Sequence, residues 1–336
     1  MKIIDRLLIK FYELKCRINT RLRQNLKQID ILTHISESSD TGEIDFTGAI
    51  RPQKILLIIP FKDKWDLTEK CISSLKEQNL ENLELTVVLV DNNSEEDRTK
   101  KAVARVVQEG GSGIEFRSLP LPVPFNFSRI NNLAAQECLD ETFDKILFLN
   151  NDIELRETSS IRDLVAALDS NQNLGALGSS LYYPDGSIQH LFVFPGSKIV
   201  GSHPLRTKSL SKDHPWFRKA RVVPAVTGAL IMMRRSDWIA VGGFDENLPN
   251  CYQDVDLCLK VQKLGKVNGV LTHLNTIHYE TQTRKPIPHW DEVKYIYAKW
   301  GDFLAWNPMM PKTISRYSEV LCFDSKYRKY PWWKLF

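Results

Sequence analysis

Three short apolar runs restrict the fold of this chain more than any other feature of its sequence. They are Ile55–Ile59, Leu85–Val90 and Lys145–Leu149, and proline or polar residues follow each one. Apolar runs of this length without alternation predict strands that are buried on both faces of a sheet. Stretches with helical spacing accompany them, over about residues 67–78, 97–109 and 129–139. This order predicts an α/β fold with a mostly parallel, Rossmann-like sheet flanked by helices.

Carboxylates stand where such a sheet would bind a ligand. Asp91 comes directly after the second apolar run, and Asp152 follows the third. Ligands of parallel α/β sheets bind beyond the carboxyl ends of the strands. A later segment adds Asp254 and Asp256, and His278 follows it. The sequence holds neither a glycine-rich dinucleotide fingerprint nor a P-loop, so a nucleotide bound here would depend on carboxylates and a metal ion.

These side chains suit the transfer of a sugar from a nucleotide-diphosphate donor. A leaving diphosphate needs a divalent cation to neutralise its growing charge. Asp152 could supply an oxygen ligand and His278 a nitrogen ligand, which suits Mn²⁺ or Mg²⁺. Asp254 could accept the proton of an attacking hydroxyl. Taken singly, each acidic residue is better explained as a turn residue or a helix cap, and only the ordered set favours chemistry.

The same ordered set resembles the motifs of the inverting family-2 glycosyltransferases. The resemblance extends over about residues 54–280, through the segments 58–63, 90–94, 149–152, 227–229, 242–246 and 254–257 and through His278. The segment 125–132 (Phe-Asn-Phe-Ser-Arg-Ile-Asn-Asn) is similar to the bacterial branch that builds surface polysaccharides, including rhamnosyltransferase-like members. The resemblance implies a GT-A fold, a nucleotide-diphosphate sugar as donor, and transfer of a hexosyl or deoxyhexosyl group with inversion.

The resemblance also implies roles for single residues. Asp254 matches the catalytic base, and Asp152 and His278 match the ligands of Mn²⁺ or Mg²⁺. Asp91 would contact the nucleoside, and Gly228 would let the chain pass close to the donor sugar. The full set of donor-binding residues that it implies is Pro60, Phe61, Asp91, Asn131, Asn150 and Gly228.

Two positions depart from the pattern of the family. Asn150 replaces the first aspartate of the DxD motif, and Gln253 stands where an acidic residue commonly precedes the base. Because the three central residues remain, we expect an active enzyme, with an inactive relative that binds glycans or acts as a scaffold as the alternative. A sugar nucleotidyltransferase is a weaker alternative, since the segment 60–63 lacks the glycine-rich basic loop that a triphosphate would need.

The charge of the chain is concentrated at its start. Residues 1–30 hold eight basic and three acidic side chains, so the remainder is close to neutral, which argues against nucleic acid as a partner. Apolar residues in this stretch recur every three or four positions, which predicts a basic amphipathic helix over 1–32. Such a helix docks on the protein body or on a second copy in a homo-oligomer, or it lies on an anionic membrane surface.

Composition then divides the chain. We expect a linker over 33–53, a catalytic domain over 54–285 with a nucleotide-binding half (54–155) and an acceptor and catalytic half (156–285), and an aromatic-rich helical extension over 286–336. The six cysteines form no CxxC pair, which indicates a reducing setting. We therefore expect a cytoplasmic protein, peripheral on the inner face of the cell membrane, that acts on a glycan or a lipid-linked glycan.

Overall fold

The four strands in the first half of the sheet are parallel, and the three inner ones are mostly buried. The computed structural model describes Leu14 and residues 44–309, except 198, 208–212, 219 and 280–288. Its sheet runs in the order β3-β2-β1-β4 through this half, with all neighbours parallel. The strands are β1 (Gln53–Phe61), β2 (Leu83–Asp91), β3 (Ile114–Pro120) and β4 (Lys145–Leu149). The predicted α/β sheet flanked by helices is thus confirmed.

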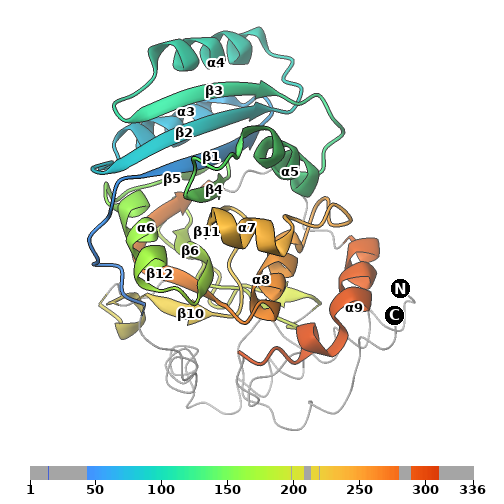
Figure 1. Ribbon diagram of the computed structural model, residues 1–336. Coiled ribbons are helices and arrows are strands. Elements are labelled where there is room, and N and C mark those ends of the chain that lie inside the picture. Colours follow the sequence, from blue (N-terminus) through green and yellow to red (C-terminus); the bar gives the residue numbers. More distant parts are fainter. Residues whose placement is uncertain are drawn as a thin grey trace.

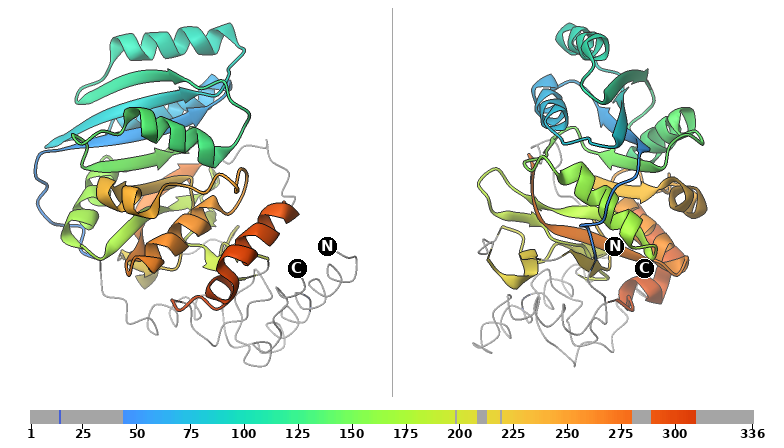
Figure 2. Two further views of the ribbon diagram at one scale, coloured as in Figure 1. Left: turned by 45° about the vertical axis from the view of Figure 1, so that its right-hand side comes forward. Right: turned by 60° about the vertical axis from the view of Figure 1, so that its left-hand side comes forward.

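Alternate residues of β1 face different helices, which is why the run has no polar member. Leu56 and Ile58 belong to the apolar cluster of α5 (Phe127–Cys138). Ile55, Leu57 and Ile59 belong to the cluster that holds α3 (Trp65–Lys76) and α4 (Asp97–Glu109). The right-hand view of Figure 2 shows the sheet edge-on between α3 and α5. A strand covered on both faces needs apolar side chains in both directions.

The second half of the sheet is mixed in direction. Strand β11 (Leu230–Arg234) lies antiparallel between β4 and β6 (Leu174–Tyr182), and β12 (Val267–His278) runs parallel to β6. The remaining strands are short: β5 (Ile153–Glu154), β7 (Ile188–His190), β10 (Arg221–Val223), and the pair β8 (Phe194–Pro195) and β9 (Gly201–Ser202). The helices are α6 (Ser160–Ser170), α7 (Arg235–Val241), α8 (Gln253–Lys263) and α9 (Trp290–Ala305), with a 3-10 turn at Pro215–Arg218 (Figure 1).

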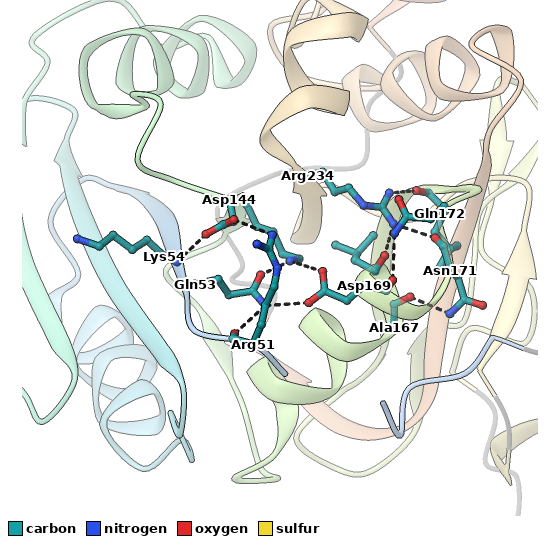
Figure 3. Close-up of polar contacts among 12 residues, drawn as sticks. Arg51, Gln53, Lys54, Asp144, Ala167, Asp169, Asn171, Gln172 and Arg234 are labelled. Carbon is teal, nitrogen blue, oxygen red and sulfur yellow. Dashed lines mark hydrogen bonds and ion pairs between the residues drawn. The ribbon is translucent and has the colours of Figure 1, made fainter. Parts of the chain in front are cut away.

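A polar cluster joins the two halves at the amino ends of β1 and β4. Figure 3 shows its members lying between β1 and the end of α6. Lys145 is only 2% exposed, and its Nζ lies 2.7 Å from Asp169 Oδ1 and also contacts Gln53. Arg234 donates to the carbonyl oxygens of Leu168 and Asn171, which lie at the end of α6. The guanidinium of Arg234 thereby provides hydrogen bonds to helix-end carbonyls that have no partner inside the helix.

The segment just before β1 is packed against the body. Ile44 forms an isolated antiparallel bridge with Ala220, and the Phe46 ring stacks on His273 with centroids 4.3 Å apart. The second part of the expected linker is therefore anchored, while the domain limits themselves stay a prediction.

The terminal segments bear on two further expectations. The predicted helix over 1–32, apart from Leu14, and the aromatic end from 310 onward lie outside the described residues. The helical part of the expected extension is α9, where Val293 and Ile296 are fully buried. Among the helices that the structure describes, none combines the length and the hydropathy that a membrane-spanning segment requires.

Candidate active site

Asp152 and His278, far apart in the sequence, meet at the carboxyl end of β4. Asp152 Oδ1 lies 3.1 Å from His278 Nε2, and the two side chains are 11% and 12% exposed. The two-residue strand β5 causes this meeting, because it pairs antiparallel with the end of β12 and sets Ile153 opposite His278. The N–H of Tyr279 also donates to the carbonyl oxygen of Asp152 at 2.9 Å. The main chain thus fixes both residues.

Gln189 orients the His278 ring. Its Nε2 donates to the main-chain oxygen of His278 at 3.3 Å, which leaves Gln189 Oε1 as the acceptor for His278 Nδ1 at 2.5 Å. A proton on Nδ1 turns the Nε2 lone pair of a neutral ring toward the carboxylate. Two acceptors that face each other require a proton or a cation between them. The donor set, one carboxylate oxygen and one oriented imidazole nitrogen, fits a divalent cation such as Mn²⁺.

Asp152 and His278 form a pair of candidate ligands within the described ranges. No group of three or more His, Cys, Asp or Glu side chains suited to a metal gathers within the part of the chain that the structure describes. A cation held by two protein ligands keeps most of its coordination for water and for substrate phosphates, as Mg²⁺ sites on nucleotides often do.

Asp254 is held at the start of α8 by main-chain donors. Its Oδ2 accepts a hydrogen bond from the N–H of Gly228 at 2.9 Å, and Oδ1 accepts one from its own neighbour Val255 at 2.8 Å. Burial raises the pKa of this carboxyl, and hydrogen bonds from main-chain N–H groups and from the Thr227 side chain oppose that rise only in part. A carboxylate with a raised pKa is a stronger base than an exposed one.

Gly228 brings Asp254 and the end of β4 together. The next residue, Ala229, accepts a hydrogen bond from the N–H of Asn150 at 2.9 Å, and β11 then continues antiparallel to β4. Asn150 precedes Asp152 by two positions. Two hydrogen bonds therefore connect the predicted base to the loop that carries the predicted metal ligand. A methyl group at Gly228 would lie 3.5 Å from Asp254 Cβ and 3.6 Å from the Phe127 ring.

The loops after β1 and β2 form the neighbouring part of the sheet edge. Phe61 is set opposite Asp91 in the parallel register. Asp91 Oδ1 accepts the N–H of Ser94 at 2.7 Å and so closes a turn. Asp63 Oδ1 accepts the N–H groups of Glu95 and Glu96, each at 3.0 Å. These hydrogen bonds fix the conformation of the loop that follows Asp91.

Two predicted donor-binding residues, Phe61 and Asn131, have buried side chains. The Phe61 ring is 4% exposed and packs edge-on against Trp65, so it belongs to the core, whereas Pro60 is partly exposed. Asn131 is fully buried and donates from Nδ2 to the main-chain oxygen of Phe127 at 2.8 Å. Their side chains are enclosed because alternate β1 positions and one face of α5 pack inward.

The segment 125–132 holds the loop before α8. Asn126 Nδ2 donates to the carbonyl oxygen of Glu246, and Ser128 Oγ donates to that of Leu248. Asn132 exchanges hydrogen bonds with the main chain of Phe244 in both directions, at 2.9 and 3.0 Å. The polar residues of this motif are therefore spaced to bind the 244–248 loop.

Sequence reasoning missed Gln189 and the acidic residue Glu292 of α9, which bonds to the loop before Asp254. Gln189 lies in a short strand without a recognisable pattern. Glu292 lies in the aromatic-rich extension, for which the sequence predicts a helix and no site residue. Asp256, which lies two positions after Asp254 in the sequence, is fully buried. It accepts a hydrogen bond from Trp300 Nε1 at 2.8 Å, which indicates a structural role.

Comparison with known proteins identifies the family. Residues 56–238, more than half of the chain, match Glycosyl transferase family 2. The chain is 30% identical over 316 residues to the O-antigen biosynthesis protein RfbC of Myxococcus xanthus. This alignment covers 89% of this chain and 24% of that protein. It is 24% identical over 220 residues to an N-acetylglucosaminyl-diphospho-decaprenol L-rhamnosyltransferase of Mycobacterium tuberculosis, which covers 61% of this chain and 70% of that protein.

The chain spans less than a third of the length of the first relatives it matches. Solved structures agree in fold. A mannosyltransferase of Pyrobaculum calidifontis in complex with GDP-Man and Mn²⁺ has a TM-score of 0.55 at 16% identity, covering 82% of this chain and 70% of that one. GalNAc-T7 with UDP, GalNAc and Mn²⁺ has a TM-score of 0.54 at 14% identity, covering 77% and 53%. With its GT-A-like sheet and the matched residues 56–238, this chain belongs to glycosyl transferase family 2.

Proposed function

We propose that this chain transfers a hexosyl or deoxyhexosyl group from a nucleotide-diphosphate sugar to a hydroxyl of a glycan or lipid-linked glycan, with inversion. The meeting of Asp152 and His278 at 3.1 Å carries this proposal. The contact brings together a carboxylate oxygen and an imidazole nitrogen, two ligand types that suit a divalent cation, at the edge of the sheet. The names of two relatives, an O-antigen biosynthesis protein and a rhamnosyltransferase for a lipid diphosphate, support this acceptor class.

Asp254 is the general base in this proposal. Its oxygens accept hydrogen bonds from the main-chain N–H groups of Gly228 and Val255, which hold the carboxylate in one orientation. The hydroxyl gives its proton to Asp254 as its oxygen attacks the anomeric carbon, and the bond to the diphosphate breaks on the opposite side. One attack of this kind inverts the anomeric configuration.

Asp152 and His278 would hold the divalent cation. When bound, the cation supplies charge neutralisation for the departing diphosphate. The residues themselves are fixed before any ligand arrives, because Tyr279 holds the main chain of Asp152 and Gln189 holds the ring of His278. Asp91, the last residue of β2, and Asn150, directly after β4, are the proposed contacts to the nucleoside and ribose.

The direct test is a panel of nucleotide sugars with Mn²⁺, with release of nucleoside diphosphate as the readout. We expect slow hydrolysis of one or a few donors, stopped by a chelator and restored by added metal. Asp152→Asn should abolish the metal response. If no donor is hydrolysed and calorimetry detects no binding of nucleoside diphosphates in Mn²⁺, while glycans do bind, then the chain is a glycan-binding relative and the proposal is wrong.

The expected membrane attachment is tested separately. Vesicles with anionic lipid should retain the full chain and release a chain that begins at Arg51, if residues 1–30 bind lipid. Equal, negligible retention of both would exclude a lipid role. Gel filtration of the same two proteins shows whether the segment instead joins two copies.

A further inference from the structure

The loop that leads to Asp254 has a strained backbone. Tyr252, which immediately precedes α8, has a φ of 66°, in the left-handed region. A side chain other than glycine is sterically disfavoured there. Such conformations persist only where neighbouring contacts enforce them. Asp254 lies two residues further on, so whatever holds Tyr252 also sets the direction of the base.

Glu292, in the first turn of α9, supplies these contacts. Its Oε2 accepts hydrogen bonds from the main-chain N–H groups of Asn250, at 3.0 Å, and Cys251, at 2.8 Å. Its Oε1 accepts a third bond from the side-chain amide of Asn250 at 2.9 Å. Glu292 is only 5% exposed, and a carboxylate is buried at this depth only when hydrogen bonds compensate its lost hydration. The pair of main-chain bonds fixes the two residues just before Tyr252.

A later turn of α9, just before Gly301, holds the first turn of α8. Lys299 Nζ lies 2.6 Å from Asp245 Oδ2 and 2.6 Å from Asp256 Oδ1. Trp300 Nε1 donates to the same Asp256 oxygen. Figures 1 and 2 show α9 alongside α8 in agreement with these contacts. The segment from Asp245 to Asp256 is therefore held at both ends by one helix, although α9 contributes no predicted site residue.

We propose that Glu292 is a positioning residue for catalysis, which holds the 250–252 turn so that the Asp254 carboxylate points at the acceptor hydroxyl. This inference rests on the proposed function, because it needs Asp254 to be the base. Misplacement of a catalytic group by about 1 Å can cost on the order of 100-fold in rate. The cation and nucleotide residues belong to other elements, so the loss of Glu292 should affect turnover and leave donor binding intact.

The test compares Glu292→Ala and Glu292→Gln with Asp291→Ala as the matched control. Asp291 is an exposed acid in the same helical turn. The glutamine can place its carbonyl oxygen at the Oε2 position and keep both main-chain bonds, whereas the alanine loses them. With a donor that the wild type uses, we expect Glu292→Ala to lower kcat by about 10- to 100-fold, with donor KM within about threefold. Glu292→Gln should stay within about threefold of the wild type, and Asp291→Ala should be unchanged.

Amide hydrogen exchange provides the readout that needs no activity. The amides of Asn250 and Cys251 should exchange faster in Glu292→Ala and remain protected in Glu292→Gln. An unchanged kcat in Glu292→Ala, a glutamine variant as impaired as alanine, or a parallel rise in donor KM would each overturn the inference. If the alanine variant does not fold, Glu292→Asp, which is too short to reach the loop, should show the same loss of kcat. An inactive wild type would refute the proposed function instead, and exchange would still decide whether Glu292 holds the turn.

Discussion

The side chain of Gln189 accepts a hydrogen bond from His278 Nδ1 at 2.5 Å, and this bond turns the opposite ring nitrogen toward Asp152. Gln189 belongs to β7, far in sequence from either residue, and it is only 5% exposed. The orientation of the imidazole is therefore set by a side chain that is itself buried. Metal ligands are commonly oriented by such partners.

Gln189→Ala should weaken metal binding without unfolding the protein. Without the oxygen of Gln189, the ring of His278 is free to rotate and to take the other tautomer, so its Nε2 is no longer held toward Asp152. Loss of an orienting partner typically costs about 10- to 100-fold in metal affinity. Titration of Mn²⁺ by calorimetry measures this. Gln172→Ala, an exposed glutamine at the opposite edge, is the control, and equal affinities of the two variants would contradict the role of Gln189.

Asp254→Asn should separate turnover from donor binding. The amide can still accept the N–H of Gly228 but cannot take a proton, and general-base assistance is typically worth about 10²- to 10⁴-fold. Binding of nucleoside diphosphate, measured by calorimetry, should change little. A variant that transfers sugar at the wild-type rate would remove Asp254 from the mechanism.

The pH dependence of transfer should report the same residue. Burial raises the pKa of Asp254 above its ordinary value of 3.8. A protonated carboxyl cannot act as a base, so the wild-type rate should fall as the pH drops through this raised pKa. The acid limb of kcat should accordingly lie above pH 3.8 and should be missing in the residual activity of Asp254→Asn.

Much of the fold could be predicted because its signals are local. The runs at 55–59, 85–90 and 145–149 carry the parallel half of the sheet, and the range of α4 agrees with its predicted limits. The direction of β11 could not be predicted, since an apolar run is the same in a parallel and an antiparallel strand. Strand β3 was missed because it is an edge strand in which apolar and charged residues mix.

For the candidate site, the sequence predicted the types of residue involved but not the contacts between them. The contact of Asp152 with His278 depends on β5, a two-residue strand that has no sequence signal of its own. The burial of Phe61 and Asn131 depends on which face of β1 and α5 each residue occupies in the folded chain. Gln189 and Glu292 act through bonds to distant main chain, and no spacing rule detects such bonds.

Two glycines should respond in opposite ways to alanine. A methyl group at Gly228 meets its neighbours at 3.5 Å or more, which is ordinary contact, so Gly228→Ala should melt near the wild-type temperature. At Gly196, with φ +68°, the methyl group would lie 2.7 Å from the main chain of α9, at Ala305 Cα and Leu304 O. Gly196→Ala should therefore lower the free energy of unfolding by about 2 kcal/mol or more.

Donor KM should respond in the opposite way, with the larger change in Gly228→Ala and the smaller one in Gly196→Ala. If Gly228 lies beside the donor sugar, its added methyl group should raise donor KM in a fully folded protein. Folded Gly196→Ala, assayed well below its melting temperature, should keep the wild-type KM. Thermal unfolding and donor kinetics on the same samples measure both effects. A donor KM unaffected by Gly228→Ala would place the sugar elsewhere.

The stability that Asp245 contributes through its contact with α9 should decrease in acid. Burial disfavours the charged form of Asp245, but Lys299, the N–H of Asn247 and the hydroxyl of Tyr295 outweigh it and lower its pKa from 3.8 to about 2. A group whose pKa is lower in the folded state stabilises the fold above its unfolded pKa. That contribution is complete above about pH 4 and is lost as the pH falls toward 2.

Asp245→Asn removes this contribution, so the free energy of unfolding should differ between wild type and variant most at pH 5. The difference should shrink at pH 3, where the wild-type carboxylate no longer gains its full advantage over the unfolded chain. Urea unfolding at the two pH values measures it. Asp291→Asn, which removes an exposed carboxylate on α9, should show a small difference at both. A difference for Asp245→Asn that is the same at pH 5 and pH 3 would mean that packing, and not the charge on Asp245, joins α9 to this segment.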